Sequence, residues 1–359
     1  MKLKKKDGIN RRSFVIGGGI ILLSPFQIIN NLNANEIKRK ITFGSCISQN
    51  EEQPIWDSII KEESEAFIFM GDNVYGDDWK TGNTEKLKKA YKKQKNKIPF
   101  RKLKKSNEIF SIWDDHDYGK NDGGSNYTYK EEAKKLFLDF WEIPKDDPRR
   151  SRGGVYFEKK KKINNSLVQF IFLDTRYFRS PLKPTDKKGA PYKERFLPDN
   201  DLKKTFLGKD QWSWLSKTLN EKADLRIIVS SIQIIAEGHG FEKWGNLPNE
   251  KRKLYDIIDN KSIKNVIFLS GDRHSGGIYK DKTKHGTEIY EITSSSLNLP
   301  LGKLLKKKDI KEEPGPNRIG PQYLMENYGM IEFFGKNNIS IFLKDIKGET
   351  INKIDLFYK

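Results

Sequence analysis

Short apolar runs that each end in a cluster of polar residues constrain the fold of this chain most. The densest cluster, Trp113-Asp-Asp-His-Asp-Tyr-Gly-Lys-Asn-Asp122, follows the run Ile109–Ile112 and carries four carboxylates. Four more runs end in the same way: Ile41–Phe43 before Ser45-Cys46, Ala66–Met70 before Gly71-Asp-Asn-Val-Tyr75, Leu167–Leu173 before Asp174-Thr-Arg176, and Val266–Leu269 before Gly271-Asp-Arg-His274. Because so much charge at the end of a buried strand is costly without a bound cation, the five clusters predict one shared site.

Strand and helix patterns alternate along the chain, which predicts a layered α/β fold. Strands are expected at Ile41–Ser45, Ala66–Met70, Ile109–Trp113, Leu167–Leu173, Arg226–Ser231 and Asn265–Ser270. Helices are expected between them at Pro54–Glu62, Thr84–Lys95, Lys130–Trp141, Asp210–Leu219 and Asn249–Asp259. Toward the C-terminus the pattern predicts a second, mainly antiparallel set of strands at Glu288–Thr293, Tyr328–Phe334, Ser340–Lys344 and Thr350–Phe357.

Three polar stretches are predicted to be long loops of the kind that shape a binding cleft. They are Arg149–Gly154, Pro181–Leu197 and Glu312–Pro321. The last reads Glu-Glu-Pro-Gly-Pro-Asn-Arg-Ile-Gly-Pro and is expected to have no regular structure, because prolines cannot donate to a β-ladder.

The N-terminus has the pattern of an export signal. A twin-arginine pair, Arg11-Arg12, precedes the apolar stretch Ile16–Phe26, which is too short for a stable membrane span. We therefore expect residues 1–35 to be a twin-arginine signal read by the export machinery, and residues 36–359 to be one domain in the periplasm or outside the cell. The sequence Leu32-Asn33-Ala34 fits signal cleavage only in part, so retention as an anchor stays open.

The chain has a formal net charge of +19, with dense lysine runs at Lys86–Lys105 and Lys159–Lys162. Such runs are solvated faces, or they attract an anionic substrate that carries phosphate. No motif for reading DNA or RNA accompanies them, so we expect no specific nucleic acid partner. The single cysteine, Cys46, excludes an internal disulfide and, at a strand end, is well placed to be a metal ligand.

In open α/β sheets, ligands bind at the carboxyl ends of the strands, where all these clusters lie. The candidate metal ligands are Cys46, Asp72, Tyr75, Asn121, Asp272 and His274. Their mixture of hard oxygen donors with thiolate and imidazole predicts a polynuclear centre in which Asp72 bridges two ions.

Several residues near this predicted centre have a second interpretation. Asn121 also suits a left-handed turn, and Asp114 with Asp115 also suits the capping of loop amides. His239 fits either the lining of a cleft or an ordinary loop. Asp272 and His274 alternate at a strand exit, so both can face the cleft only if the backbone turns there, which Gly271 permits.

Five ordered motifs give the chain a family resemblance. They are Gly71-Asp-Asn-Val-Tyr75, the Trp113–Asp122 cluster, Leu173-Asp-Thr-Arg176, Leu207-Gly-Lys-Asp-Gln-Trp-Ser-Trp-Leu215 and Ser270-Gly-Asp-Arg-His274. From about Lys40 to Phe334 the chain resembles the alkaline phosphatase D (PhoD-like) family of calcineurin-like metallophosphoesterases. It departs from the wider superfamily at Cys46 and Asp272, where Asp-x-His and Gly-His-x-His motifs are usual, and this argues against a plain dizinc or dimanganese site.

The resemblance implies a four-layer αββα sandwich with two mixed β-sheets and the hydrolysis of phosphomonoesters, phosphodiesters or both. It also implies a centre of Fe(III) and Ca(II), with other divalent metals as alternatives. Cys46 and Tyr75 would bind the iron, Asp72 would bridge, and the remaining candidates would complete the shell.

The expected chemistry is attack on phosphorus by a metal-activated hydroxide. Arg176 would hold phosphate oxygens with its planar fork, and His116 would protonate the leaving alkoxide. The alternatives are a phospholipase or nuclease on the same scaffold, or a non-catalytic secreted protein that binds anionic polymers.

Overall fold

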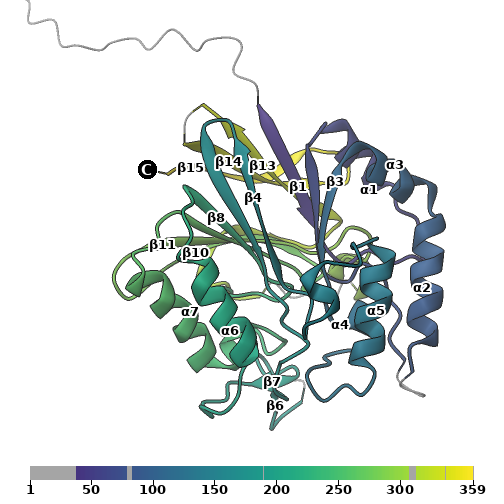
Figure 1. Cartoon of the computed structure of the whole chain (residues 1–359), viewed down its shortest axis with the longest axis horizontal. Coiled ribbons are helices and arrows are strands. Elements are labelled where there is room, and N and C mark those ends of the chain that lie inside the picture. Colours follow the sequence, from purple (N-terminus) through teal and green to yellow (C-terminus); the bar gives the residue numbers. More distant parts are fainter. Residues whose placement is uncertain (1–37, 79–82, 189, 307–312, 336, 359) are drawn as a thin grey trace, which may run out of the picture. The chain divides into compact units, whose positions relative to one another are not determined.

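Two mixed β-sheets pack face to face, and helices cover the outer face of each sheet (Figure 1). The computed structural model describes residues 38–78, 83–188, 190–306, 313–335 and 337–358. The predicted export signal, residues 1–35, lies outside the described residues. Among the residues that are described, no helix is both long and apolar enough to cross a bilayer.

The first sheet has six strands in the order β15-β14-β13-β1-β2-β3. Its parallel half comprises β1 (Arg39–Gly44), β2 (Ala66–Met70) and β3 (Glu108–Ile112). Its antiparallel half comprises β13 (Asn327–Phe334), β14 (Asn338–Asp345) and β15 (Thr350–Phe357). The two halves join where Ile41 of β1 pairs with Ile331 of β13.

The second sheet has seven strands in the order β12-β10-β11-β9-β8-β5-β4. The parallel centre is β5 (Ser166–Phe172), β8 (Leu225–Val229), β9 (Val266–Ser270) and β11 (Glu288–Ser294). Antiparallel strands flank it: β4 (Phe157–Ile163) on one side, β10 (Gly276–Lys282) and β12 (Arg318–Tyr323) on the other. The strands β6 (Lys183–Pro184) and β7 (Phe196–Leu197) form a separate small pair.

The helices form two outer layers. The first sheet is covered by α1 (Ile55–Lys61), α2 (Glu85–Asn96), α3 (Ile98–Ser106) and α5 (Lys130–Phe140). The second is covered by α6 (Gly208–Thr218) and α7 (Pro248–Asn260). Short helical turns complete the fold: α4 (Asp115–Tyr118), α8 (Leu301–Leu304), η1 (Pro148–Arg150) and η2 (Trp244–Asn246).

Strand β2 shows why the sheets become buried on both faces. Successive side chains on a strand point to opposite faces, so Phe67 and Phe69 pack against helices while Ile68 and Met70 pack against the other sheet. All five residues of β2 are buried. The predicted αββα sandwich with two mixed sheets is therefore confirmed.

Two of the fold predictions were wrong. The C-terminal strands do not form a second set of their own, because β13, β14 and β15 extend the first sheet while β11 lies inside the second. The stretch predicted to have no regular structure forms strand β12 from Arg318 onward. This strand is at the edge of its sheet. Proline, which has no N–H group to donate, is tolerated in edge strands, and Pro321 is such a case.

Candidate metal centre and catalytic cleft

The loops after four parallel strands meet at one edge of the sandwich. The Cys46 amide donates to the Gly71 carbonyl at 3.3 Å, which links the ends of β1 and β2. Ser45 forms an isolated parallel bridge with Ser295, which joins the end of β1 to the end of β11 in the other sheet. The Gly271 amide donates to Ser231 at 3.0 Å, next to the end of β9. The carboxyl ends of the parallel strands of both sheets therefore lie next to one another.

Asp72 is at the centre of the side chains that meet there. Its Oδ2 lies 3.4 Å from Cys46 Sγ and accepts a hydrogen bond from the Tyr75 hydroxyl at 3.3 Å. Ligand atoms of Cys46, Asp72 and His274 all lie within 4.8 Å of one another. A further group within the same limit joins Asp72 to Asp272, together with Asp114 and Asp115. The structure thus brings together five of the six predicted ligands.

Asn121, the sixth predicted ligand, lines the same cleft. Its side-chain nitrogen is buried and has no hydrogen-bond partner. Near it, ligand atoms of Asp115, Asp122 and Glu242 form a cluster of oxygens alone. Glu242 was not predicted from the sequence, because it stands in a loop without periodicity. The centre therefore has a side with sulfur and nitrogen donors and a side with oxygen donors only.

The buried donors make a set that suits cations. Burial raises the pKa values of the Cys46 thiol, the Asp72 and Asp272 carboxyls and the Tyr75 hydroxyl well above their usual range. Two carboxylate oxygens, Asp114 Oδ2 and Asp115 Oδ1, are buried without a hydrogen-bond partner. Bound cations would lower these raised pKa values, because they favour the deprotonated forms of all these groups. The residues present therefore fit a metal centre.

His274 is oriented by the chain that follows β11. Its Nδ1 lies 2.5 Å from the Leu299 carbonyl oxygen, which leaves Nε2 as the free ring nitrogen. Burial lowers the pKa of His274 to about 4, so its imidazole is neutral near pH 7. A neutral imidazole with one nitrogen fixed by a carbonyl is the usual state of a histidine that binds metal.

The backbone of the centre is strained. Cys46, Asp72, Asp272 and His274 have φ angles of 59°, 51°, 66° and 49°, which lie in the left-handed region. Non-glycine residues occupy that region at a cost, and such strained positions tend to cluster at functional sites. The predicted turn of the backbone at this strand exit is present: Asp272 and His274 themselves take the left-handed conformation, and both line the cleft. Gly271 allows close approach, since a Cβ there would collide with Ser45 Oγ.

His116 lies beside the cluster at the start of α4. Its Nδ1 lies 2.6 Å from Asp77 Oδ1, and its ring centroid lies 4.3 Å from that of Tyr75, with the two ring planes tilted by 35°. Burial acts to lower the pKa of His116, but the carboxylates of Asp115, Asp72 and Asp77 outweigh it and raise that pKa. Asp77 therefore fixes one ring nitrogen of His116 and favours the protonated ring. Asp77 was not predicted from the sequence, where the only signal for it is its position two residues after the Gly71–Tyr75 motif.

Arg176 is not placed as predicted. Its side chain is fully buried and lies outside the cleft lining. Its Nε donates to Asp114 Oδ1 and its Nη1 to Glu242 Oε2, both at 2.5 Å. A fork to phosphate would need these ion pairs to break, so the position does not support a direct substrate contact. The arginines that line the cleft are Arg195 and Arg273.

The cleft beside the centre has a volume of about 880 Å³. Its polar floor includes Asp115, His116, Asn121, Asp272 and His274. His239, for which the sequence left two interpretations, lines this cleft, and its Nε2 lies 3.0 Å from Gln233 Oε1.

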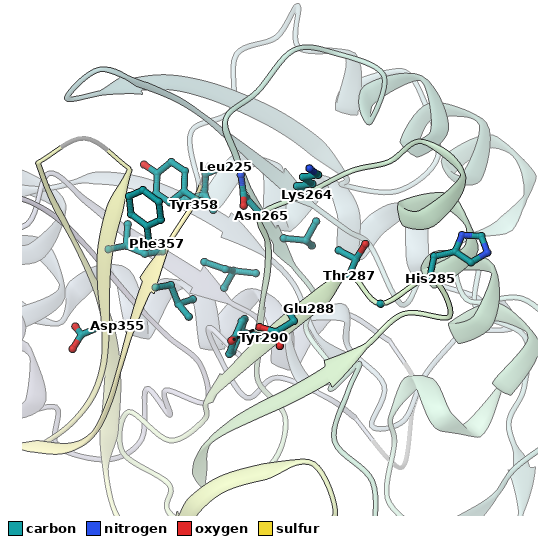
Figure 2. A pocket seen from close by; sticks show the side chains of 15 residues that line it. Leu225, Lys264, Asn265, His285, Thr287, Glu288, Tyr290, Asp355, Phe357 and Tyr358 are labelled. Atoms are coloured by element: carbon teal, nitrogen blue, oxygen red, sulfur yellow. Dashed lines mark hydrogen bonds between the residues drawn. The ribbon is translucent and has the colours of Figure 1, made fainter.

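A second cavity of about 580 Å³ lies between strands β9 and β11 of one sheet and β15 of the other (Figure 2). Figure 2 shows His285 at one end of this cavity and Asp355 with Phe357 at the other; between them Glu288 accepts a hydrogen bond from the Tyr290 hydroxyl at 3.1 Å. None of the predicted site residues lines it. The chemistry therefore belongs to the first cleft.

Two facing mixed sheets with acidic, histidine and cysteine side chains at their strand ends define a metallophosphatase fold. The structure of purple acid phosphatase PPD1 from yellow lupin (Lupinus luteus) seeds superposes with a TM-score of 0.58 at 11% identity, covering 90% of this chain and 54% of that one. A structure of PhoD superposes with a TM-score of 0.66 at 14% identity, covering 89% of this chain and 68% of that one.

The chain belongs to the PhoD-like phosphatase family, whose model matches residues 41–339. This confirms the family that the five motifs indicate. Alkaline phosphatase D of Bacillus subtilis (strain 168) is 26% identical over 167 residues, which cover 42% of this chain and 28% of that protein. The alignment thus spans less than a third of that relative.

Proposed function

We propose that this protein is a metal-dependent hydrolase of phosphomonoesters, phosphodiesters or both. The observation that carries the proposal is the shared position of Asp72, which belongs to three of the four groups of clustered ligand atoms found in the described residues. A carboxylate shared in this way suits a bridge between two cations. In two-metal phosphoesterase sites, the two cations together stabilise the attacking and the leaving oxygen.

For the metals, we propose iron on the side of Cys46, Tyr75 and His274, and calcium on the side of the oxygen donors. Thiolate, phenolate and imidazole suit a transition metal, whereas Asp272, Asn121 and neighbouring carboxylates suit a hard cation. Bound ions would neutralise charge on the phosphoryl oxygens and lower the pKa of a water molecule. A protein purified with iron should show a visible tyrosinate-to-iron absorption that Tyr75→Phe removes. Full activity with zinc or manganese alone, and no such absorption, would contradict the assignment.

For the chemistry, we propose that His116 protonates the leaving group. The attacking water first loses one proton to solvent. The oxygen of the resulting hydroxide forms the new bond to phosphorus, the bond from phosphorus to the ester oxygen breaks, and the Nε2 proton of His116 passes to that oxygen. Asp77 supports this role, because it occupies Nδ1 and directs Nε2 toward the cleft. Arg195 is the candidate contact for phosphate oxygens: it lines the cleft and is 41% exposed, and its ion pair with Asp122, at 2.7 Å, is partly open to solvent, unlike the fully buried pairs of Arg176.

The proposal is tested with 4-nitrophenyl phosphate and bis(4-nitrophenyl) phosphate, assayed before and after chelation and after return of iron and calcium. We expect turnover of at least one ester, loss on chelation and recovery with the metals. Absence of turnover in the metal-loaded protein would favour a non-catalytic protein that binds anionic polymers. The ratio of the two rates distinguishes a monoesterase from a diesterase.

We also propose that the protein is exported by the twin-arginine route to the periplasm or beyond. The support is the sequence pattern around Arg11 and Arg12 alone. Exchange of both arginines for lysine should retain the protein in the cytoplasm, which fractionation with an antibody measures. Unchanged export of this variant would contradict the proposal, and Lys5→Arg is a matched control in the same segment.

A further inference from the structure

The cleft beside the metal centre is lined by apolar side chains as well as by polar ones. We call Tyr192, Leu301 and Leu305 the apolar rim; all three line the cleft. Tyr192 is 56% exposed and Leu305 is 40% exposed, although both are large apolar residues. Exposed apolar side chains that gather at a concave site often mark a surface that a ligand covers.

Leu301 of the apolar rim is attached directly to a candidate metal ligand. The Leu301 amide donates to the His274 carbonyl at 2.7 Å, and the Leu299 carbonyl lies 2.5 Å from His274 Nδ1. The turn α8 therefore begins within three residues of the atom that orients His274. Leu301 is therefore fixed through the backbone to the residue that would hold a metal ion.

Tyr192 of the apolar rim belongs to the loop between β6 and β7. The amides of Arg195 and Phe196 both donate to the Gly240 carbonyl, at 3.0 and 2.7 Å, which fixes this loop to the wall of the cleft. Tyr192 has a φ angle of 64°, a costly conformation for a bulky residue. The chain thus holds an aromatic ring in the open at a backbone position that disfavours it, which suggests a function beyond packing.

The volume of the cleft indicates what covers the rim. At about 880 Å³, the cleft is near the upper end of the range of about 300–1,000 Å³ for small-molecule sites. A phosphate group with its metals would occupy only the polar floor. The space along Tyr192 and Leu305 remains for the organic part of the substrate.

We propose that the apolar rim binds an apolar ester group of the substrate, so that the enzyme prefers phosphodiesters with an extended alkyl chain to those with a methyl group. This inference rests on the proposed phosphoesterase function and adds the substrate class. Burying a methylene group stabilises a complex by about 0.8 kcal/mol at most. Because the rim is about half exposed, only part of a chain becomes buried there.

The test compares methyl and hexyl 4-nitrophenyl phosphate, which have the same leaving group and differ by five methylene groups. The readout is the ratio of kcat/KM for the hexyl ester to that for the methyl ester, measured with the metal-loaded full-length protein below the aggregation concentration of the hexyl ester. We expect a ratio of about ten for the wild type, and a decrease of at least about three-fold in Leu305→Asn and in Tyr192→Ala. Leu305→Met and Tyr192→Phe should keep the wild-type ratio.

Leu202→Asn is the matched control, because Leu202 is 82% exposed and does not line the cleft. It should leave the ratio at the wild-type value. Turnover of the methyl ester with a ratio near one in the wild type, or a ratio that Leu305→Asn and Tyr192→Ala do not change, would overturn the inference while the phosphoesterase function stands. A preference that appears only when the hexyl ester aggregates would assign the rim to a lipid-like surface and would also overturn it. No turnover of either ester would overturn both proposals.

Discussion

Arg176→Gln tests whether Arg176 holds the interior of the protein together or binds phosphate. The wild-type guanidinium lies between Asp114 and Glu242, at 2.5 Å from each, and all three side chains are buried. Glutamine keeps hydrogen-bonding groups but leaves two buried carboxylates without their cation. Removal of one partner from a buried ion pair costs about 3–5 kcal/mol.

This cost translates into a measurable change in melting temperature. For a unit that spans residues 37–359, the entropy of unfolding is about 0.7 kcal/mol per degree. The expected decrease in Tm is therefore about 4–7 °C, measured by calorimetry on metal-loaded protein. Arg39→Gln is the control, because the Arg39 side chain is 48% exposed and its ion pair with Glu65 lies on the surface. A surface pair contributes less than about 1 kcal/mol, so Tm should fall by no more than about 1.5 °C.

The same variant distinguishes the two roles of Arg176. If the guanidinium bound substrate, Arg176→Gln would raise KM strongly and leave Tm near the wild-type value. A Tm within 1.5 °C of the wild type would refute the structural role and restore the contact with phosphate that the sequence predicts. Burial raises the pKa of Asp114 to about 6 even with Arg176 present. Loss of the guanidinium should raise that pKa further.

Three further predictions concern the metal centre and the first sheet. Asp72→Asn should lower kcat/KM by about 100-fold or more and reduce the bound metal measured by mass spectrometry, because the shared ligand is lost; wild-type turnover would exclude a bridging role. Burial acts to raise the pKa of Glu62, but hydrogen bonds from Lys344 and Tyr328 outweigh it and lower that pKa below 4.5. A carboxyl group whose pKa is lowered by folding stabilises the fold at pH values above its unfolded pKa. Glu62→Gln should therefore lower the free energy of unfolding, measured with urea at pH 7, by about 1–3 kcal/mol. This loss should shrink as the pH falls below 4.5, and a loss that does not depend on pH would contradict the prediction. Gly329→Ala should destabilise by about 1–3 kcal/mol, because its Cβ would collide with the Phe43 ring on the paired strand β1; calorimetry that shows no decrease in Tm would exclude this packing.

The sequence predicts those elements best in which the apolar pattern is uninterrupted. Strand β2 has the predicted bounds Ala66–Met70, because five buried residues stand between polar neighbours. Strand β4 was missed, because Lys159–Lys162 mask its alternation, and an edge strand can expose such residues. Helix α3 was missed for a related reason: only Phe100 and Leu103 of its residues are buried, within a basic run.

The sequence predicts which residues lie near the site better than it predicts which partner each of them contacts. Asp72, Tyr75 and His274 follow strands, and strand ends meet at one edge by topology. The partners that side chains choose do not follow from their position after a strand. Arg176 contacts Glu242, 66 residues away, and His116 contacts Asp77, 39 residues away. Such long-range pairs decide which charged groups face the cleft.

The left-handed backbone at four candidate ligands has a consequence for how this chain can change. Cys46, Asp72, Asp272 and His274 occupy conformations that glycine adopts without steric cost. Selection for folding alone would thus favour glycine at these positions, and selection for turnover would oppose it. In a library of variants sorted first by thermal resistance and then by activity, these four positions should be enriched in glycine in the first pool and restored to the present residues in the second. Thermal stability and catalytic activity thus favour different residues at these four positions.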